Sequence, residues 1–126
     1  ELGDVIQVLE EVWEHSFDWI WERLGAHLEI PGYLNVYIAY VNGVPASAAW
    51  IYFHTGRQFA GLWGGSTRAA YRQQGLYSSL LAVRAQAALR RGVRFLTVDA
   101  SPMSAPILSK YGFIRIATAW ACEVNL

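Results

Sequence analysis

Residues 67–81, which read T-R-A-A-Y-R-Q-Q-G-L-Y-S-S-L-L, decide how the chain is organised. A β-prone apolar run, 59–66, precedes this segment, and apolar residues with helical spacing follow it to about Arg91. The pattern predicts a strand, a polar loop with the single glycine Gly75, and a helix N-terminus. Unpaired backbone amides and the helix dipole at such an N-terminus favour an anion, most often phosphate. On its own, the segment is equally compatible with an ordinary turn and a solvated Arg72, so the neighbouring elements have to decide.

The composition limits the class of protein. The chain has 126 residues, of which 54% are hydrophobic and 16% charged, and this predicts one domain, 1–126, with a packed core. No apolar run reaches the roughly 18 residues of a membrane span. Ten basic and ten acidic residues cancel, whereas a nucleic-acid surface needs a basic excess. The single cysteine, Cys122, excludes an internal disulfide, and no secretion signal is visible. We therefore expect a cytoplasmic protein that binds neither nucleic acid nor a membrane.

The N-terminal part of the chain has the spacing of one amphipathic helix over residues 2–24. Asp4 is a candidate cap. The other carboxylates lie mostly opposite the apolar residues, which indicates a solvated face rather than a metal or acid–base cluster. Trp19 and Trp21 are expected to pack in the core, with a substrate pocket or a dimer contact as alternatives. The predicted apolar face comprises Ile6, Leu9, Trp13, Phe17, Ile20 and Leu24.

Three antiparallel strands are predicted after this helix. Two β-rich runs, 34–41 and 44–53, flank the dipeptide Asn42-Gly43. That dipeptide is the strongest short signal for a hairpin, because a type I′ turn needs two positive φ angles. A second reversal, at residues 54–56, leads into a third strand, 58–66.

Glycines interrupt this third strand just before the polar loop. Glycine weakens a strand and usually marks a bulge, or the close approach of a ligand or another backbone. A strand that bends away from its neighbour there would leave backbone groups unpaired for a ligand. The glycines are Gly61, Gly64 and Gly65.

A helix and a parallel strand are predicted after the loop. Residues 75–91 have helical spacing and end in a C-cap glycine. The alternating residues 93–98 predict a strand parallel to the third strand, reached by a right-handed crossover. A short helix begins after Asp99 and closes at Gly112, and residues 113–126 form one strand, or two. The predicted fold is α/β (α+β), a mixed sheet with an antiparallel meander followed by a parallel strand pair and its crossover helix.

This order of elements resembles the GNAT superfamily of acyl-CoA-dependent N-acyltransferases, over residues 34–113. The family's loop motif is Gln/Arg-x-x-Gly-x-Gly/Ala, which Arg72 and Gln74-Gly75 match, with Tyr77 at the last small position. A second family signature is a short helix that ends in Gly-Phe, here S-A-P-I-L-S-K-Y-G-F up to 112–113. The family opens with a strand before its first helix. The sequence shows no such strand, so the resemblance implies that an N-terminal segment was lost or that a preceding domain supplies it.

The resemblance implies a binding site for acetyl-CoA. In the family, the loop amides hold the pyrophosphate, and the pantetheine arm pairs with the strand before the loop, where that strand splays from the next parallel strand. The corresponding segment here is 62–67. Ser101 stands where the family often has an Asn that touches the cofactor. The implied cofactor-binding residues are Leu62, Gly65, Ser66, Thr67, Arg72, Gln73, Gln74, Gly75, Leu76, Tyr77, Ser78, Ser101, Ser104 and Leu108.

The catalytic acid of the family is absent from its usual position. Direct attack of a neutral amine on the thioester needs a base, an oxyanion contact and a proton for the departing thiolate. Many members carry a general-acid Tyr five residues before the Phe of Gly-Phe, and that position is Leu108 here. Leucine cannot donate a proton, so Tyr111 is the candidate acid, with Ser104 or Ser109 acting through water as alternatives.

The catalytic base is also open. Asp99 is the candidate because it ends a parallel strand, where ligands of such sheets bind, while the alternative, a cap for the next helix, is the commoner role. His54 or a carboxylate of the first helix are alternatives. His15 and His27 lack metal-ligand spacing with any partner, so no metal is expected.

The resemblance predicts an N-acetyltransferase that moves an acetyl group from acetyl-CoA to a primary amine of a small molecule or a peptide. One rival is a GNAT-like module that holds acyl-CoA or a partner without turnover, which the leucine at position 108 favours. Another is a structural half of a larger protein, which the missing first strand favours. The tail after Phe113 is short for the two closing strands of the family, and an exposed edge would favour a homodimer.

Overall fold

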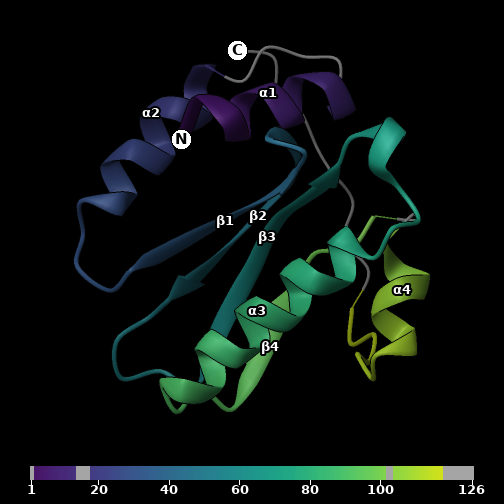
Figure 1. The fold of residues 1–126 in the computed structure, drawn as a ribbon. Helices are drawn as coiled ribbons and strands as arrows, with labels where there is room; N and C mark the ends of the chain where they lie inside the picture. The colour runs from purple at the N-terminus through teal and green to yellow at the C-terminus, as the bar shows by residue number, and fades with distance from the viewer. Residues whose placement is uncertain (1, 14–17, 102–103, 118–126) are drawn as a thin grey trace, which may run out of the picture.

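The part of the chain that the computed structural model describes, residues 2–13, 18–101 and 104–117, is built on a four-stranded mixed sheet (Figure 1). The strand order is β1-β2-β3-β4. The strands are β1 Leu34–Val41, β2 Val44–Phe53, β3 Phe59–Thr67 and β4 Phe95–Val98. The helices are α1 Leu2–Trp13, α2 Asp18–Leu28, α3 Leu76–Arg90 and α4 Ala105–Lys110, and a short 3-10 helix, η1, covers Ala69–Tyr71. None of the described helices is both long and apolar enough to cross a membrane.

The predicted antiparallel meander is confirmed. β1 and β2 have the predicted bounds, and β3 is shifted only slightly from the predicted 58–66. Asn42 has a φ of +51° and Gly43 a φ of +78°, as a type I′ turn requires. The hairpin could be predicted because its turn chemistry is local to two residues.

The predicted parallel pair is also confirmed, with α3 as the crossover helix. The pairing begins with Phe59 opposite Phe95 and ends with Leu62 opposite Val98. β4 is shorter than the predicted 93–98, and α3 falls within the predicted 75–91.

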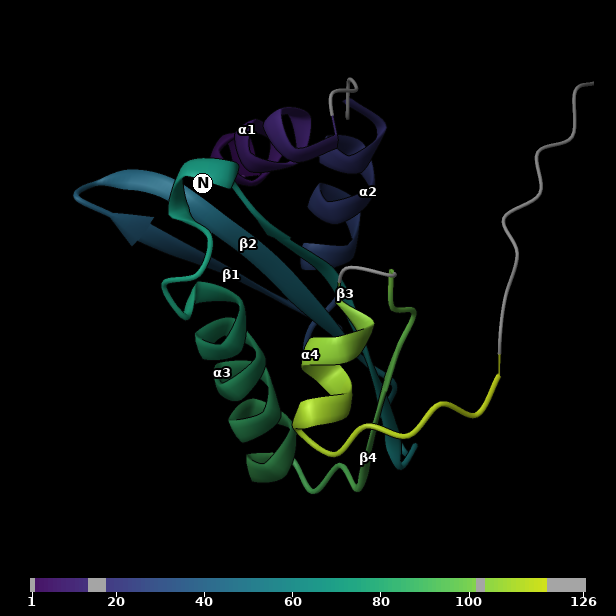
Figure 2. The same cartoon turned by 90° about the vertical axis from the view of Figure 1, so that its right-hand side faces the viewer.

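The prediction of a single helix over residues 2–24 is wrong, because this part of the chain forms α1 and α2, which lie together over one face of the sheet (Figure 2). Residues 14–17 lie outside the described part of the chain. One apolar stripe cannot run along two helices of different direction. α1 instead buries its own face, and Trp13 of the predicted stripe stays half exposed. The buried residues of α1 are Val5, Val8 and Leu9.

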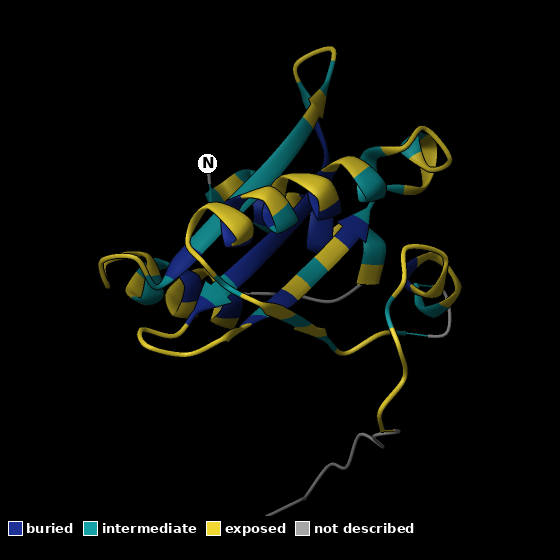
Figure 3. Cartoon of the chain, turned by 90° about the horizontal axis from the view of Figure 1, so that it is seen from below, coloured by how far each residue is buried: buried dark blue, intermediate teal, exposed yellow. Residues whose placement is uncertain are grey.

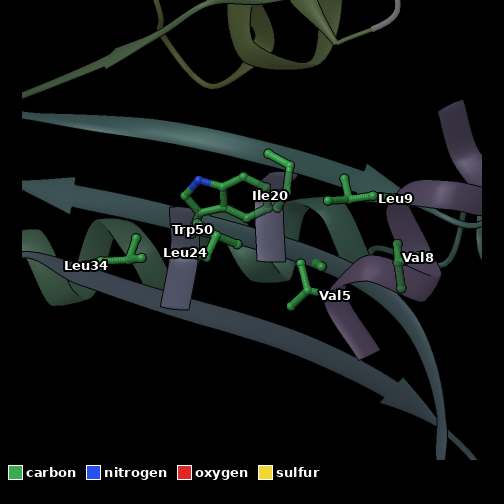
Figure 4. Packing of buried hydrophobic residues seen from close by; sticks show 8 residues of the cluster. Val5, Val8, Leu9, Ile20, Leu24, Leu34 and Trp50 are labelled. Carbon is green, nitrogen blue, oxygen red and sulfur yellow. The ribbon is translucent and has the colours of Figure 1, made fainter. Parts of the chain in front are cut away.

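The core has two parts, one on each face of the sheet. Burial is concentrated along the strands and on the inner sides of the helices (Figure 3). On one face α1 and α2 pack against β1 and β2, with Trp50 among their side chains (Figure 4). On the other face α3 and α4 pack against β2 and β3. The first core comprises Val5, Val8, Leu9, Ile20, Leu24, Leu34, Ala48 and Trp50. The second comprises Ile51, Phe53, Ala60, Leu62, Leu81, Ala87, Ala88 and Leu108.

The predicted final strand does not form where the structure describes it. Residues 113–117 carry no strand, and Ile114 and Ile116 are almost fully exposed. The remainder of the prediction, residues 118–126 with Cys122, lies outside the described part. β4 is therefore an edge strand of the described sheet, as β1 is at the opposite side.

Candidate functional site

The two parallel strands separate where β4 ends. Their pairing stops with Leu62 opposite Val98, but β3 continues to Thr67. Beyond Leu62, no described strand pairs with the side of β3 that faced β4. That side of β3 therefore borders a wedge-shaped opening between the two strands.

A β-bulge shapes the β3 wall of this wedge. Trp50 pairs with Trp63 and Ala48 pairs with Ser66, so two steps along β2 match three steps along β3. Gly64 lies in the bulge with a φ of +71°, and a Cβ atom there would overlap the six-membered ring of Trp50. The predicted bulge is confirmed. Glycine is needed at position 64 both for its backbone angle and for lack of space.

A cavity of about 180 Å³ lies in the wedge, lined by α1, the end of β3, α3 and the segment after β4. Part of the predicted site comes together there. The predicted site residues that line the cavity are Leu62, Gly65, Ser66, Tyr77, Asp99, Ser101 and Ser104. The cavity is also lined by Leu9, Trp13, Trp63, Gly64, Arg84 and Val98, which were not among the predicted site residues.

The N-terminus of α3 has the backbone geometry of an anion site. Gly75 caps the helix with a φ of +80°, and Gln73 before it has a φ of +62°. The Ser79 amide donates to the Gly75 carbonyl at 2.9 Å. The Ser79 amide makes the first backbone hydrogen bond of α3. The amides of residues 76–78 come before it, so they have no carbonyl partner within the helix and point towards its N-terminal end.

The other residues of the predicted loop do not line the cavity, although they lie in the sequence between Ser66 and Tyr77, which do. The Arg72 Nε donates to the Thr67 carbonyl at 3.0 Å, and this bond ties the loop to the end of β3. Residues 72–75 are exposed. Among the predicted cofactor-binding residues, those that do not line the cavity are Thr67, Arg72, Gln73, Gln74, Gly75, Leu76, Ser78 and Leu108.

Tyr77 places an aromatic ring in the wedge, at the position where the family motif has a small residue. A Cβ atom on Gly65 would lie 2.8 Å from the Tyr77 ring, so Gly65 leaves the space that the ring occupies. Burial raises the pKa of the Tyr77 phenol, and the charge of Arg84 and the Ser104 hydroxyl oppose this shift only in part. The phenol is therefore protonated and neutral at physiological pH.

Arg84 is a buried cation on the floor of the cavity, with only 2% of its surface exposed. Its Nε donates to the Leu80 carbonyl at 3.0 Å, and its Nη1 donates to the carbonyls of Trp50 at 3.2 Å and Trp63 at 3.3 Å. No carboxylate of the described residues pairs with it. Burial lowers the pKa of Arg84, but a guanidinium remains charged in proteins.

The sequence contains a signal for Arg84 that sequence analysis missed. Arg84 stands four residues after Leu80 and four before Ala88, which are both buried on the inner face of α3. A charged residue at such a core position is rare without a partner. The partners are backbone carbonyls of β2 and β3, which a reading of residue types does not reveal.

Two indoles form the wall of the cavity on the α1 side. The Trp13 Nε1 donates to the Ser66 Oγ at 3.0 Å. The Trp63 ring lies back over Gly61, where a Cβ atom would be 3.0 Å from the indole nitrogen. Trp13 and Trp63 are each 50% exposed, so a ligand in the cavity has access to them.

The family's usual acid position, Leu108, and the candidate acid, Tyr111, both lie outside the cavity. Leu108 is 3% exposed and packs in the second core. The Tyr111 hydroxyl donates to the Ser78 Oγ at 3.1 Å, and the side chain is half exposed. The hydroxyls of Ser101 and Ser104 do line the cavity, 3.1 Å from each other.

The candidate bases are also separated. Asp99 lines the cavity and is exposed. His54 does not line the cavity; it makes an edge contact with the Tyr33 ring. No group of three or more His, Cys, Asp or Glu among the described residues is placed to hold a metal ion.

The fold is that of GNAT acetyltransferases, as predicted. The aminoglycoside N-acetyltransferase AAC(6')-Iy, solved with a bisubstrate analogue of CoA, has a TM-score of 0.78 at 19% identity, over 99% of this chain and 92% of that one. Glucosamine-6-phosphate N-acetyltransferase from Arabidopsis thaliana has a TM-score of 0.79 at 10% identity, over 99% and 95%. A transcriptional regulator from Bacillus halodurans C-125 has a TM-score of 0.78 at 15% identity, over 98% and 95%. No protein-family model and no curated protein matches the sequence.

Proposed function

We propose that this chain is an N-acetyltransferase that moves the acetyl group of acetyl-CoA to a primary amine. The wedge carries the proposal, because one cavity is bordered by the N-terminus of α3 at Tyr77 and by a side of β3 that pairs with no described strand beyond Leu62. An amide-bearing arm pairs with such a strand, and a phosphate group binds such a helix N-terminus. The fold similarity to acetyltransferases supports the proposal.

The residues present suit acetyl-CoA as the co-substrate. The amides of residues 73–78 would hold the phosphates, and the backbone of 62–67 would hold the arm. Ser101 and Ser104 offer hydroxyl groups to its polar atoms. Because the Tyr77 ring lies in the same wedge, the arm has to pass beside this ring or displace it.

The transfer forms a bond between the acceptor nitrogen and the acetyl carbonyl carbon and breaks the thioester C–S bond. The nitrogen loses one proton and the thiolate takes one up. Asp99 keeps its candidate role as the base, because its carboxylate lines the cavity. Tyr77 replaces Tyr111 as the candidate acid, because its neutral phenol lines the cavity and Tyr111 does not.

The acceptor is not fixed by the fold. The similar structures include enzymes named for aminoglycosides and for glucosamine 6-phosphate, so amino sugars are one acceptor class to test.

A second function, binding of acyl-CoA without turnover, has specific support. Leu108 is buried where many GNAT enzymes have their acid, and the Tyr77 ring narrows the wedge. One similar structure is named a transcriptional regulator.

Two measurements separate these functions. Acetyl-CoA at about 100 times its Kd should stabilise the fold by roughly 2.7 kcal/mol, a shift of several degrees in melting temperature. Release of free CoA thiol with a panel of amines then tests turnover. Binding without thiol release would favour the binding module, and absence of both would refute both functions.

Gly75→Glu tests the placement of the phosphates. The position has open space around it, so a glutamate side chain adds negative charge at the helix N-terminus and some backbone strain. Gly56→Glu is the matched control, because Gly56 also has a positive φ and open space but lies in the turn before β3. We expect loss of acetyl-CoA binding for Gly75→Glu only; equal binding by both variants would place the phosphates elsewhere.

A further inference from the structure

The cavity has two chemically different sides, because side chains alternate along β3. Trp63 is the ladder partner of Trp50, so both side chains lie on the sheet face covered by α1 and α2. Leu62 points to the other face and packs in the second core. The side near α3 holds Tyr77 and Arg84, and the side near α1 holds the two indoles, Trp13 and Trp63.

Asp99 lies on the side of the indoles. The rings of Phe59 and Phe95 stack with centroids 4.9 Å apart, so these register partners point to the same face. A Cβ atom on Gly61 would approach both the Trp63 ring and the Thr97 hydroxyl, so Thr97 shares that face as well. Asp99 follows Thr97 by two residues, immediately after β4 ends at Val98; continuing the alternation by one residue would direct it the same way, and Asp99 does line the cavity.

The indoles are held in place before any acceptor binds. The hydrogen bond from Trp13 to Ser66 fixes one ring, and the packing of Trp63 over Gly61 fixes the other. Fixed aromatic walls lose little conformational entropy when they receive a ligand.

The chemistry of these walls selects a class of acceptor. Indole faces and a carboxylate both attract an ammonium group. Asp99 is the only carboxylate that lines the cavity among the described residues, and this matches one positive charge rather than several. Leu9 and the two indoles make most of this side apolar, and the Ser66 hydroxyl already accepts the hydrogen bond of the Trp13 indole. The cavity of about 180 Å³ is comparable to the roughly 150 Å³ cavity that binds benzene, so we expect an acceptor body of about one ring.

Resting on the proposed acetyltransferase function, we propose that the acceptor is a compact monoamine with an aromatic or branched apolar body, of the 2-phenylethylamine type. Asp99 binds the ammonium group and, as the candidate base, accepts one proton from it, so that the neutral amine attacks the thioester; the body lies against Trp13 and Trp63. The amino sugars named for the similar structures are poor acceptors, because their hydroxyls or additional charges find few polar partners on these walls.

The test is acetyl transfer from acetyl-CoA to 2-phenylethylamine, ethanolamine, glucosamine and tobramycin. We expect kcat/KM for 2-phenylethylamine to exceed that for each other amine by about tenfold or more. Burial of an apolar group in a binding pocket changes kcat/KM by about this factor. A preference for glucosamine or tobramycin would overturn the inference and leave the acetyltransferase function standing. Acetyl-CoA binding without acetylation of any amine would overturn both.

Two variants test whether the preference for 2-phenylethylamine depends on the indole of Trp63 and the carboxylate of Asp99. Trp63→Leu should lower kcat/KM for 2-phenylethylamine about tenfold more than it lowers kcat/KM for ethanolamine. Asp99→Asn should raise the KM of both amines. Trp21→Ala is the control, because Trp21 is as exposed as Trp63 but does not line the cavity, and it should change neither value. An unchanged preference in Trp63→Leu, with folding checked by circular dichroism, would refute the aromatic site.

Discussion

Replacement of Gly64 by alanine should destabilise the fold more than the same change at other glycines with a positive φ. Two costs add at this position. An L-residue held in the left-handed region costs about 1–2 kcal/mol. The new Cβ atom also overlaps the Trp50 ring, which is 6% exposed and has little space to move, and overpacking of this kind costs about 1–3 kcal/mol. The expected loss is therefore about 2–5 kcal/mol in the free energy of unfolding.

Gly43→Ala separates the two costs. Gly43 has a φ of +78°, but no atom lies within 4 Å of a Cβ built there, so this variant carries only the backbone cost of about 1–2 kcal/mol. Urea denaturation followed by far-UV circular dichroism gives both free energies. A loss at Gly64 within about 0.5 kcal/mol of the loss at Gly43 would refute the steric argument.

A double-mutant cycle identifies the atoms responsible. The overlapping atoms belong to the six-membered ring of Trp50, which Trp50→Leu removes. In that background Gly64→Ala should cost about 1–3 kcal/mol less than in the wild type. Equal costs in the two backgrounds would show that the bulge does not need the indole.

Two further predictions concern charged side chains. Arg84→Met should lower the free energy of unfolding, measured by urea denaturation, by about 2–3 kcal/mol. The variant leaves the carbonyls of Leu80, Trp50 and Trp63 without the guanidinium donor, although removal of a buried charge offsets part of the loss. A change below about 0.5 kcal/mol would show that these hydrogen bonds do not stabilise the fold. Hydrogen bonding to Arg68 holds the pKa of the Glu11 carboxyl below its usual value of 4.5, so its small stabilisation is present above that pH and is lost as pH falls through the lowered pKa. Glu11→Gln should therefore be slightly less stable than the wild type at about pH 7, and the difference should disappear once the pH is below the lowered pKa of Glu11; a difference that persists in strong acid would contradict the ion pair.

The features that the sequence predicts well depend on residues that are close together in the chain. The hairpin at Asn42 and Gly43 depends on two residues, and the strand, loop and helix around Gly75 depend on a short segment of the chain. The bulge was predicted because glycines mark one, but the ring that excludes a side chain from Gly64 belongs to another strand.

The parts of the site that could not be predicted depend on contacts between distant segments. Arg84 meets a carbonyl 34 residues away at Trp50, and Trp13 meets a hydroxyl 53 residues away at Ser66. Tyr77 stands at a position where the family motif has a small residue, and the motif does not show that its ring occupies the wedge. Residue types do not show which side of a helix a long side chain takes, or which backbone group it will meet.

Arg84 also makes the distribution of charge in the cavity uneven, although the chain as a whole is neutral. Ten positive and ten negative residues cancel for the whole chain, but the described wedge has a guanidinium on its floor and a carboxylate, Asp99, on its α1 side. A low-dielectric cavity concentrates the field between such groups. Anionic groups are therefore favoured near Arg84 and cationic groups near Asp99.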